Sequence, residues 1–233
     1  MIPMKTMVIT GASTGLGKVM ALKFAKDGYI VCAIARSKEK LNDLASQVPG
    51  QIIAYSADIG DANQVKETFE KIFSEHQKID VLINNASVFN SCNFYEEELS
   101  NIERLIDTNL KGTMFCTHAV LKSMVEQKGG HVINIASVSG TRGIPQQAIY
   151  GASKHGVVGF SDVIGQEVKE FGVHVCAICP GGIDTPLWND SNPYPGITED
   201  LIDPVELTDL VDFVLDKPTL YKKMIMFPMS EWH

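Results

Sequence analysis

Several features common in other protein classes are missing from this chain. No stretch reaches the roughly 18 uninterrupted apolar residues of a membrane span, and the start, MIPMKTMVIT, lacks the apolar core of a signal peptide. Five cysteines, an odd number, do not suit a disulfide framework. We therefore expect a cytoplasmic protein with no membrane partner.

Basic residues are also in deficit, because 20 Lys and Arg face 28 Asp and Glu, for a net charge of −8. An acidic surface repels phosphate backbones, so nucleic acid is not an expected partner, although a local basic site could still bind a phosphorylated small molecule. The sequence shows no zinc-ligand cluster, and we expect no metal.

One pair of cysteines has the C-x-x-C spacing of redox and zinc sites. Cys176 and Cys179 lie in the apolar run HVCAICP, which is typical of a strand. Positions three apart in a strand point to opposite faces, a redox pair normally opens a helix, and zinc needs more ligands. We interpret both residues as buried core thiols.

What the chain does have is a regular alternation of strand-length apolar runs and longer helix-period stretches. The predicted strands are residues 6–10, 30–35, 51–56, 81–84, 131–135, 174–179 and 223–227. The predicted helices are residues 16–27, 38–48, 62–77, 102–127 and 150–171, with a last helix starting near Pro204 after an Asp203 N-cap.

This alternation predicts an α/β fold: a doubly wound parallel sheet of about seven strands with helices on both faces. The chain has no internal repeat or linker, so we expect a single domain over residues 1–233. Residues 186–203 are dense in Pro, Asn and Asp, which indicates a substrate loop within that domain.

A glycine-rich turn, TGASTGLG, joins the first strand to the first helix. Glycines allow a tight turn and close approach to a pyrophosphate, and the helix start attracts anions. The spacing of Gly11, Gly15 and Gly17 is G-x-x-x-G-x-G, which differs from the general dinucleotide fingerprint. An ordinary strand-to-helix turn is therefore the alternative interpretation.

A second motif, YGASK, places Tyr150 and Lys154 four residues apart, on one face of a helix. An ammonium beside a phenol lowers the phenol's pKa from about 10. Y-x-x-x-K is common by chance, so the order of motifs decides: TGASTGLG, NNA, Ser137 after the fifth strand, YGASK, then PGG after the sixth.

This order resembles that of the short-chain dehydrogenase/reductase family, in its single-domain branch, over nearly the whole chain to about residue 188. The resemblance implies a Rossmann-type fold and a nicotinamide-dependent oxidoreductase acting on CH–OH or C=O groups. It implies Tyr150 as general acid and base, with Lys154 lowering its pKa and binding the nicotinamide ribose. Ser137 would donate to the substrate oxygen, and Asn109 would hold a water in the proton relay.

The resemblance also implies a set of cofactor contacts. Asp58 resembles the acid that meets the adenine amino group, and Thr185 the group that reaches the carboxamide. The other expected contacts are Gly11, Ser13, Thr14, Gly15, Leu16, Gly17, Ile59, Asn85, Ala86, Tyr150, Lys154, Pro180, Gly181 and Ile183. The family usually reads NNAG, but Ser87 replaces that glycine here; other members carry NNAS, so we expect activity to survive.

The end of the second strand, VCAIARSKEK, indicates which nicotinamide is used. Ala35 stands where NAD-type relatives hold an acid that meets the ribose 2′-OH. Arg36 and Ser37 follow, and a guanidinium can grip a 2′-phosphate bidentately. We predict NADP(H) over NAD(H), with Ser13 as a further contact; a solvated basic loop is the alternative.

The predicted reaction is reduction of a ketone or aldehyde to an alcohol. A largely apolar substrate pocket is expected from Val88, Phe89, Phe94, Ile144, Leu187, Trp188 and Tyr194. His155, although next to Lys154, is predicted to pack or face solvent. A 3-oxoacyl-acyl-carrier-protein reductase and a catalytically silent NADP-binding sensor are the alternatives, and we expect a homodimer or homotetramer.

Overall fold

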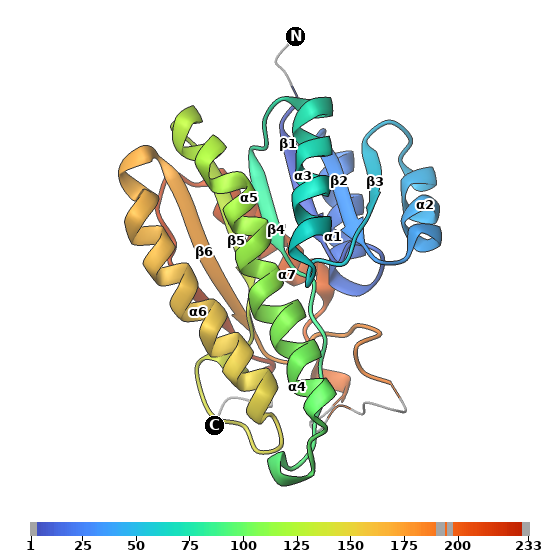
Figure 1. The fold of residues 1–233 in the computed structure, drawn as a ribbon, viewed down its shortest axis with the longest axis vertical. Helices are drawn as coiled ribbons and strands as arrows, with labels where there is room; N and C mark the ends of the chain where they lie inside the picture. Colours follow the sequence, from blue (N-terminus) through green and yellow to red (C-terminus); the bar gives the residue numbers. More distant parts are fainter. Residues whose placement is uncertain (1–3, 190–193, 195–197, 230–233) are drawn as a thin grey trace.

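The computed structural model describes residues 4–189, 194 and 198–229. Within them, seven parallel strands form one sheet in the order β3-β2-β1-β4-β5-β6-β7 (Figure 1). The strands are β1 Thr6–Thr10, β2 Ile30–Ala35, β3 Ile52–Ser56, β4 Val81–Asn84, β5 Gly130–Ile135, β6 Val173–Pro180 and β7 Lys223–Met226. The fold class is confirmed, and each predicted strand agrees within one residue at either end.

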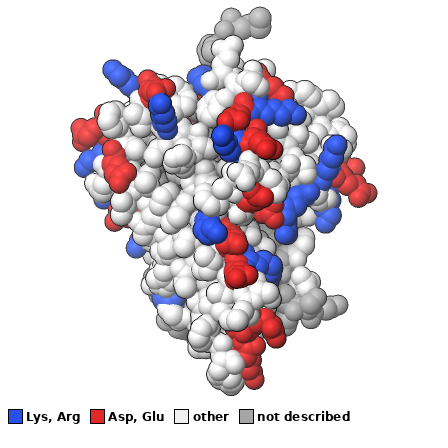
Figure 2. All heavy atoms as spheres, viewed as in Figure 1, with Lys and Arg blue, Asp and Glu red and all other residues white. Residues whose placement is uncertain are grey.

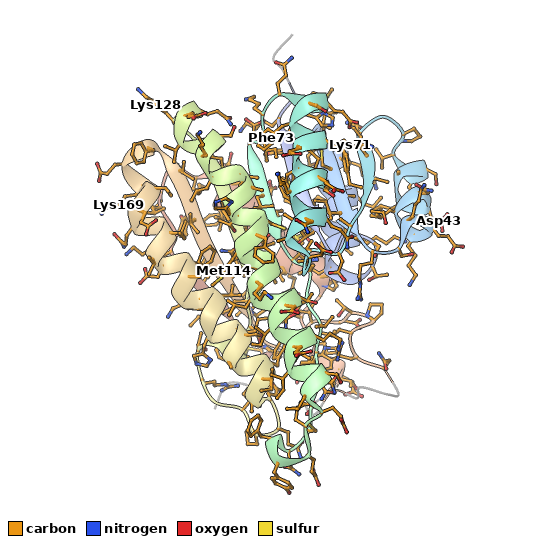
Figure 3. All side chains as sticks on the ribbon, in the orientation of Figure 1. Asp43, Lys71, Phe73, Met114, Lys128 and Lys169 are labelled. Carbon is orange, nitrogen blue, oxygen red and sulfur yellow. The ribbon has the colours of Figure 1, made fainter. Side chains whose placement is uncertain are left out.

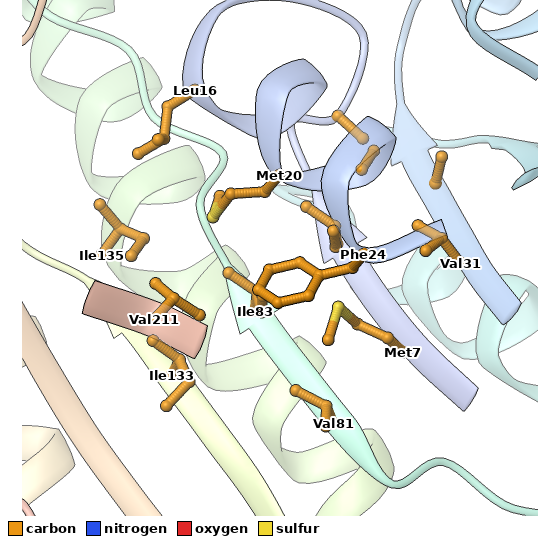
Figure 4. Close-up of a cluster of buried hydrophobic side chains, with 14 of the residues drawn as sticks. Met7, Leu16, Met20, Phe24, Val31, Val81, Ile83, Ile133, Ile135 and Val211 are labelled. Carbon is orange, nitrogen blue, oxygen red and sulfur yellow. The ribbon is translucent and has the colours of Figure 1, made fainter. Parts of the chain in front are cut away.

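Helices cover both faces of the sheet. They are α1 Gly15–Lys26, α2 Lys38–Gln47, α3 Ala62–His76, α4 Leu99–Ile106, α5 Gly112–Gln127, α6 Ala148–Val168 and α7 Pro204–Asp216. On one face, Phe24 of α1 packs with Met7 and Ile83 of the sheet, and Val211 of α7 joins the same cluster (Figure 4). A second cluster on the other face contains residues of α3, α5 and α6.

The predicted helix boundary signals act as expected. Gly28 lies two residues after the end of α1, directly after the C-cap Asp27, with φ +92, a conformation that favours glycine, and its N–H donates to Ala25 O. Asp203 Oδ1 accepts from Val205 N at 2.7 Å, so it caps α7, whose first turn contains Pro204.

The helix predicted near residues 102–127 is wrong in one respect. The helical segment begins three residues earlier, at Leu99, and a π-helical turn, Asp107–Lys111, separates α4 from α5. A pattern of period 3.6 does not reveal one extra residue in a turn, and π turns are frequent at functional sites. The helix predicted at residues 150–171 is α6 followed by the 3₁₀ turn Lys169–Phe171.

The C-x-x-C pair behaves as core. Cys176 packs in the cluster that contains α1 and α7, whereas Cys179 packs with Ala136 and Val157. The two thiols therefore face opposite sides of β6, as predicted. Both are buried, and burial raises the pKa of Cys176 to about 12.

All strands run in the same direction, so their carboxyl ends lie together at one end of the sheet and their amino ends at the other. These two ends are called the carboxyl edge and the amino edge. The carboxyl ends of the strands point toward the lower half of Figure 1, where α4 and α6 begin. Lys128 and Lys169, at the far ends of α5 and α6, mark the opposite, amino edge (Figure 3). Every parallel strand delivers its following loop to the carboxyl edge, so the motif loops converge there.

The predicted substrate loop at residues 186–203 is described in part. Its described residues hold the 3₁₀ turn Thr198–Asp200 and an isolated bridge between Ile183 and Ile202. Residues 190–193 and 195–197 of that prediction lie outside the described residues. In the part of the chain that is described, none of the helices combines the length and apolar character needed to cross a membrane.

Candidate active site

A cleft of about 990 Å³ opens at the carboxyl edge of the sheet. It is lined by all the residues that the sequence nominated as catalytic or cofactor-binding except Gly17 and Asn109. Gly17 lies against Gly11, and Asn109 bonds to Val88, so both support residues that do line the cleft. The motifs that are dispersed over the sequence thus meet in one cavity.

The glycine-rich turn at one end of the cleft is built for close approach. Gly11 has φ +67 and Gly15 φ +52, in the left-handed region that glycine tolerates. A Cβ on Gly17 would lie 2.3 Å from Gly11 O, so only glycine lets α1 start this close to the turn. The positively polarised start of α1 therefore borders the cleft at Gly15 and Leu16.

The turn after β4 is fastened to the glycine-rich turn. Thr10 Oγ1 accepts from the main-chain N–H groups of Asn85 and Ala86, at 3.0 and 3.1 Å. Asn85 Nδ2 donates to Thr10 O at 2.9 Å. The Asn85 side chain was predicted to contact the nucleotide, and in the structure it lines the cleft while holding the two loops together.

Tyr150 and Lys154 lie buried on one turn of α6. Lys154 Nζ is over the Tyr150 ring, 5.6 Å from its centroid, and donates to Ile135 O at 2.9 Å. Burial lowers the pKa of Lys154 to about 8 and raises the pKa of Tyr150 to about 12. Hydrogen bonds with Ser137 and Ser87 act against the rise in the Tyr150 pKa, because they stabilise the phenolate.

Two residues that the sequence analysis did not nominate orient Ser137. Ser137 Oγ accepts from Ser139 N at 3.1 Å and lies 3.3 Å from Ser139 Oγ. Ser139 Oγ in turn donates to Gln147 Oε1 at 2.7 Å. No motif in the sequence marks either residue as a partner of Ser137, because the contacts depend on how the loop folds.

Asn109 lies in the π-helical turn and is 1% exposed. Its side-chain amide pairs with the main chain of Val88, accepting from the N–H and donating to the C=O, both at 2.8 Å. It also accepts from Ser87 Oγ and donates to Ser153 Oγ, each at 3.2 Å. Asn109 thus ties the loop after β4 to α6; its implied role in holding a water stays a prediction.

The part of the cleft beside the end of β2, which neighbours the glycine-rich turn, is basic and exposed. Arg36, Ser37 and Lys40 line it where β2 leads into α2. Ser37 Oγ accepts from Lys40 N at 3.3 Å, so this side chain caps α2. Asp58 lines the same region, and its Oδ1 accepts from Gly60 N at 2.9 Å.

Aromatic side chains form one wall beside Tyr150. Phe89 meets the Tyr150 ring edge to face at 4.8 Å, and the Trp188 ring lies 5.1 Å from Phe89. Tyr194 continues the row 4.8 Å from Trp188, and a Cβ on Gly182 would collide with its ring. The apolar wall predicted from the sequence therefore exists.

Two further predictions concern residues outside this cavity. Phe94 was expected in the pocket, but it is 61% exposed and lies outside the cleft lining, so that expectation was wrong. It sits in a 3₁₀ turn before α4, which carries it away from the strand ends. His155 is exposed and bonds to Gly151 O at 2.9 Å, which agrees with its prediction as a residue outside the site.

The chain resembles known proteins over most of its length. Its residues 5–195 match the model of the short chain dehydrogenase family. The chain belongs to the short-chain dehydrogenase family. As a member, it is an oxidoreductase that acts on alcohol or carbonyl groups with a nicotinamide cofactor.

Individual relatives agree with this assignment. A 3-oxoacyl-acyl-carrier-protein reductase of Thermotoga maritima is 36% identical over 186 residues, which cover 78% of this chain and 76% of the relative. Carbonyl reductase family member 4 of Xenopus tropicalis is 32% identical over 224 residues, and 92% of each chain is covered. The solved structure of ElxO with NADP bound superposes with a TM-score of 0.87 at 29% identity, covering 97% of both chains.

Proposed function

We propose that this short-chain dehydrogenase is an NADP(H)-dependent carbonyl reductase, which converts a ketone or an aldehyde to an alcohol with Tyr150 as general acid. One observation carries the proposal. Tyr150 and Ser137 line the same cleft, Ser137 acts to lower the Tyr150 pKa, and the Lys154 ammonium lies over the Tyr150 ring. Two hydroxyl donors beside a buried cation are the groups that a developing alkoxide needs.

The residues at the other end of the cleft fit a dinucleotide phosphate. Gly11 and Gly17 form a turn in which a Cβ would strike main-chain atoms, so the backbone can approach a pyrophosphate closely. Arg36 and Lys40 supply positive charge beside β2, which ends in Ala35 rather than an acid. The NADP bound in ElxO supports the same preference in this chain.

When bound, the nicotinamide supplies the hydride in the reductive direction. The Ser137 and Tyr150 hydroxyls would donate to the substrate oxygen and polarise the carbonyl. Because the Tyr150 pKa is raised to about 12 by burial, its hydroxyl is protonated at neutral pH and ready to give its proton to the new alkoxide. The Lys154 ammonium then stabilises the phenolate that is left.

A 3-oxoacyl-acyl-carrier-protein reductase is the second candidate, favoured by the relative from Thermotoga maritima. Docking an acidic carrier protein calls for a basic surface near the cleft. On the face that Figure 2 shows, Lys and Arg are interspersed with Asp and Glu, and the lower end, where residues 96–98 are all Glu, is acidic. This distribution favours a free small-molecule substrate.

The experiment follows NADPH consumption with a panel of aldehydes, diketones and acetoacetyl thioesters, and repeats each reaction with NADH. The proposal predicts turnover with NADPH that exceeds turnover with NADH on at least one free carbonyl compound. Preference for acetoacetyl thioesters would favour the acyl-carrier reductase. Binding of NADPH without turnover of any carbonyl would contradict the reductase and favour the silent sensor.

Three expectations of the sequence analysis are not tested by the described structure or by the relatives, and they stay predictions. They are the single-domain organisation, the cytoplasmic location and the assembly into a homodimer or homotetramer. Light scattering of the purified protein at micromolar concentration tests the last, since a monomer would contradict it.

A further inference from the structure

Gln147 ends a short row of hydrogen bonds that starts at the Ser137 hydroxyl. Ser137 Oγ lies 3.3 Å from Ser139 Oγ, and Ser139 Oγ donates to Gln147 Oε1 at 2.7 Å. All three residues are buried, and all three line the cleft. The row therefore joins the proposed donor to the substrate oxygen with an amide side chain in the same cavity.

The Gln147 amide uses only its oxygen in this row. The amide nitrogen carries two N–H donors. Among the residues that the structure describes, none accepts from Gln147 Nε2, and this nitrogen is not one of the side-chain atoms that are buried without a partner. Nε2 is therefore the end of the side chain that stays accessible, and the space beside it is the cleft that Gln147 lines.

The main chain holds Gln147 in this position from both sides. Gln146, directly before it, has φ +65, a left-handed conformation that residues other than glycine adopt only when the surroundings enforce it. Gln146 O accepts from Cys92 N at 3.0 Å. Gln147 N donates to Ile144 O at 3.2 Å, and Gln147 O accepts from Gly151 N at 2.7 Å. These bonds fix the side chain where it enters the cleft.

We propose that Gln147 is a specificity-determining residue, which donates from Nε2 to a second oxygen of the substrate beside the carbonyl that is reduced. This inference rests on the proposed carbonyl reduction and names its substrate class, a free diketone. Because only two hydrogen bonds separate the Gln147 amide from the Ser137 hydroxyl, the second oxygen lies on a carbon close to the reacting one. Gln147 holds that oxygen and gives up no proton, whereas Tyr150 protonates the carbonyl that receives the hydride.

Support of Ser139 alone is the rival explanation, because Gln147 Oε1 also fixes the Ser139 hydroxyl. The two roles differ in which substrates they affect. Loss of a group that only positions Ser137 lowers the rate by the same factor for every carbonyl, since every carbonyl uses the Ser137 hydroxyl. Loss of a donor to the second oxygen lowers the rate further for a substrate that carries this oxygen.

The test measures kcat/KM with NADPH for butanedione and butanone, two ketones that differ in one carbonyl oxygen. Gln147→Met removes the whole amide, whereas Gln147→Glu keeps an oxygen for Ser139 and removes the N–H donors. Ser139→Ala removes the hydroxyl that links Ser137 to Gln147. Gln166→Met, which makes the same change at an exposed position of α6, is the matched control. Thermal melting and an NADPH fluorescence titration of each variant check folding and cofactor binding.

We expect both Gln147 variants to lower kcat/KM for butanedione by about tenfold more than for butanone, the effect of one buried hydrogen bond. Ser139→Ala lowers both by the same factor, and Gln166→Met matches the wild type. An equal factor for the two ketones in both Gln147 variants, or a wild-type preference for butanone, overturns the inference while leaving the reductase intact. Absence of any carbonyl turnover that depends on Tyr150 in the wild type overturns both.

Discussion

The two edges of the same sheet treat their buried polar groups differently. At the amino edge, Asp80 accepts from Thr6 N at 2.8 Å and from Lys78 Nζ at 2.6 Å, so its charge is matched within the chain. At the carboxyl edge, Lys154 is 2% exposed and donates to the main-chain oxygen Ile135 O. Its buried cation thus rests on a neutral acceptor, whereas the exposed Lys78 has a carboxylate.

This difference shows that the fold accepts a loss of folding free energy at the carboxyl edge, where the functional groups lie. A buried cation without a counter-ion costs free energy, and burial accordingly lowers the pKa of Lys154 to about 8. The parallel strands place all motif loops at that edge, around the 990 Å³ cleft. At the amino edge, the rings of His131 and His174 stack edge to face with centroids 4.8 Å apart.

Removal of the Lys154 ammonium is expected to have the largest effect on the contrast between the two edges. We expect Lys154→Met to lower kcat/KM by about 10³, within the range of positioned acid–base groups, because the phenolate loses its stabilising cation. Stability, by contrast, stays level or rises, since a buried charge is replaced by an apolar chain of similar length. Steady-state kinetics and thermal melting measure the two effects.

Lys128→Met is the matched control, because Lys128 ends the neighbouring helix α5 at the amino edge and is exposed. It should leave both quantities near the wild-type values. A large loss of stability in Lys154→Met would contradict the claim that the buried cation destabilises the fold. An equal loss of activity in Lys128→Met would contradict the claim that activity depends on the carboxyl edge alone.

The glycine-rich turn offers the next largest effect. In Gly17→Ala the new Cβ would lie 2.3 Å from Gly11 O and 2.5 Å from Asn85 Nδ2, so the turn must shift. We expect NADPH binding to weaken by about tenfold or more and stability to fall by about 1–3 kcal/mol, the usual cost of overpacking. A fluorescence titration and a denaturant melt provide the measurements.

Gly159→Ala is the comparison variant. A Cβ there meets nothing within 4 Å on the exposed side of α6, so the change should stabilise the helix by about 1 kcal/mol or less and leave binding unchanged. Equal NADPH affinity in the Gly17 and Gly159 variants would mean that the turn does not hold the cofactor.

Arg36 tests the nucleotide preference at the same edge. We expect Arg36→Ala to weaken NADPH binding by about tenfold, or about 1.4 kcal/mol, while NADH binding is unchanged, because only NADPH carries the 2′-phosphate. Arg104→Ala on α4, where the guanidinium bonds to Asn101, is the control of equal charge change. If NADPH binding in the Arg36 variant stays at the wild-type value, the basic loop is merely solvated.

An effect of similar size to that of Arg36 belongs to the amino edge. Burial, with smaller contributions from the nearby charges of His174 and Lys5, lowers the pKa of His131 to about 4 from 6.5. Between those pH values the unfolded chain binds a proton that the folded protein does not, so stability falls as the pH drops. We expect a loss of about 1–2 kcal/mol after allowing for partial exposure.

His131→Phe keeps an aromatic ring against His174 and removes the titration. Thermal melts of this variant between pH 7 and 4 should therefore fall less steeply than those of the wild type, while activity at pH 7 is retained. Parallel curves for the two proteins would assign the acid sensitivity to other groups.

The sequence predicted the sheet well because its signals are local. Continuous apolar runs such as VLIN and VINIA by themselves indicate strands that are buried on both faces. Asp203 and Pro204, two adjacent residues, mark the start of a helix. Only those site residues that belong to sequence motifs could be predicted. The order of motifs nominated Tyr150, Lys154 and the glycine-rich turn, and all the residues nominated in them except Gly17 line the cleft.

What could not be predicted depends on contacts between distant residues. The π-helical turn that carries Asn109 separates α4 from α5, where the sequence predicted one continuous helix. The bonds from Asn109 to Val88 and Ser153 span 21 and 44 residues, and periodicity says nothing about such pairs. Ser87 was visible as a departure from the family pattern, but its bond to Asn109 appears only in three dimensions.

The most direct test of the account compares Tyr150→Phe with the wild type in two assays: NADPH binding by fluorescence titration, and NADPH oxidation with the best carbonyl substrate. Phenylalanine keeps the ring against Phe89 and removes only the hydroxyl. We predict binding within about twofold of the wild type and a fall in kcat/KM of about 10²–10⁴, because the proton donor is gone. Turnover at the wild-type rate in Tyr150→Phe would contradict the assignment of Tyr150 as the general acid.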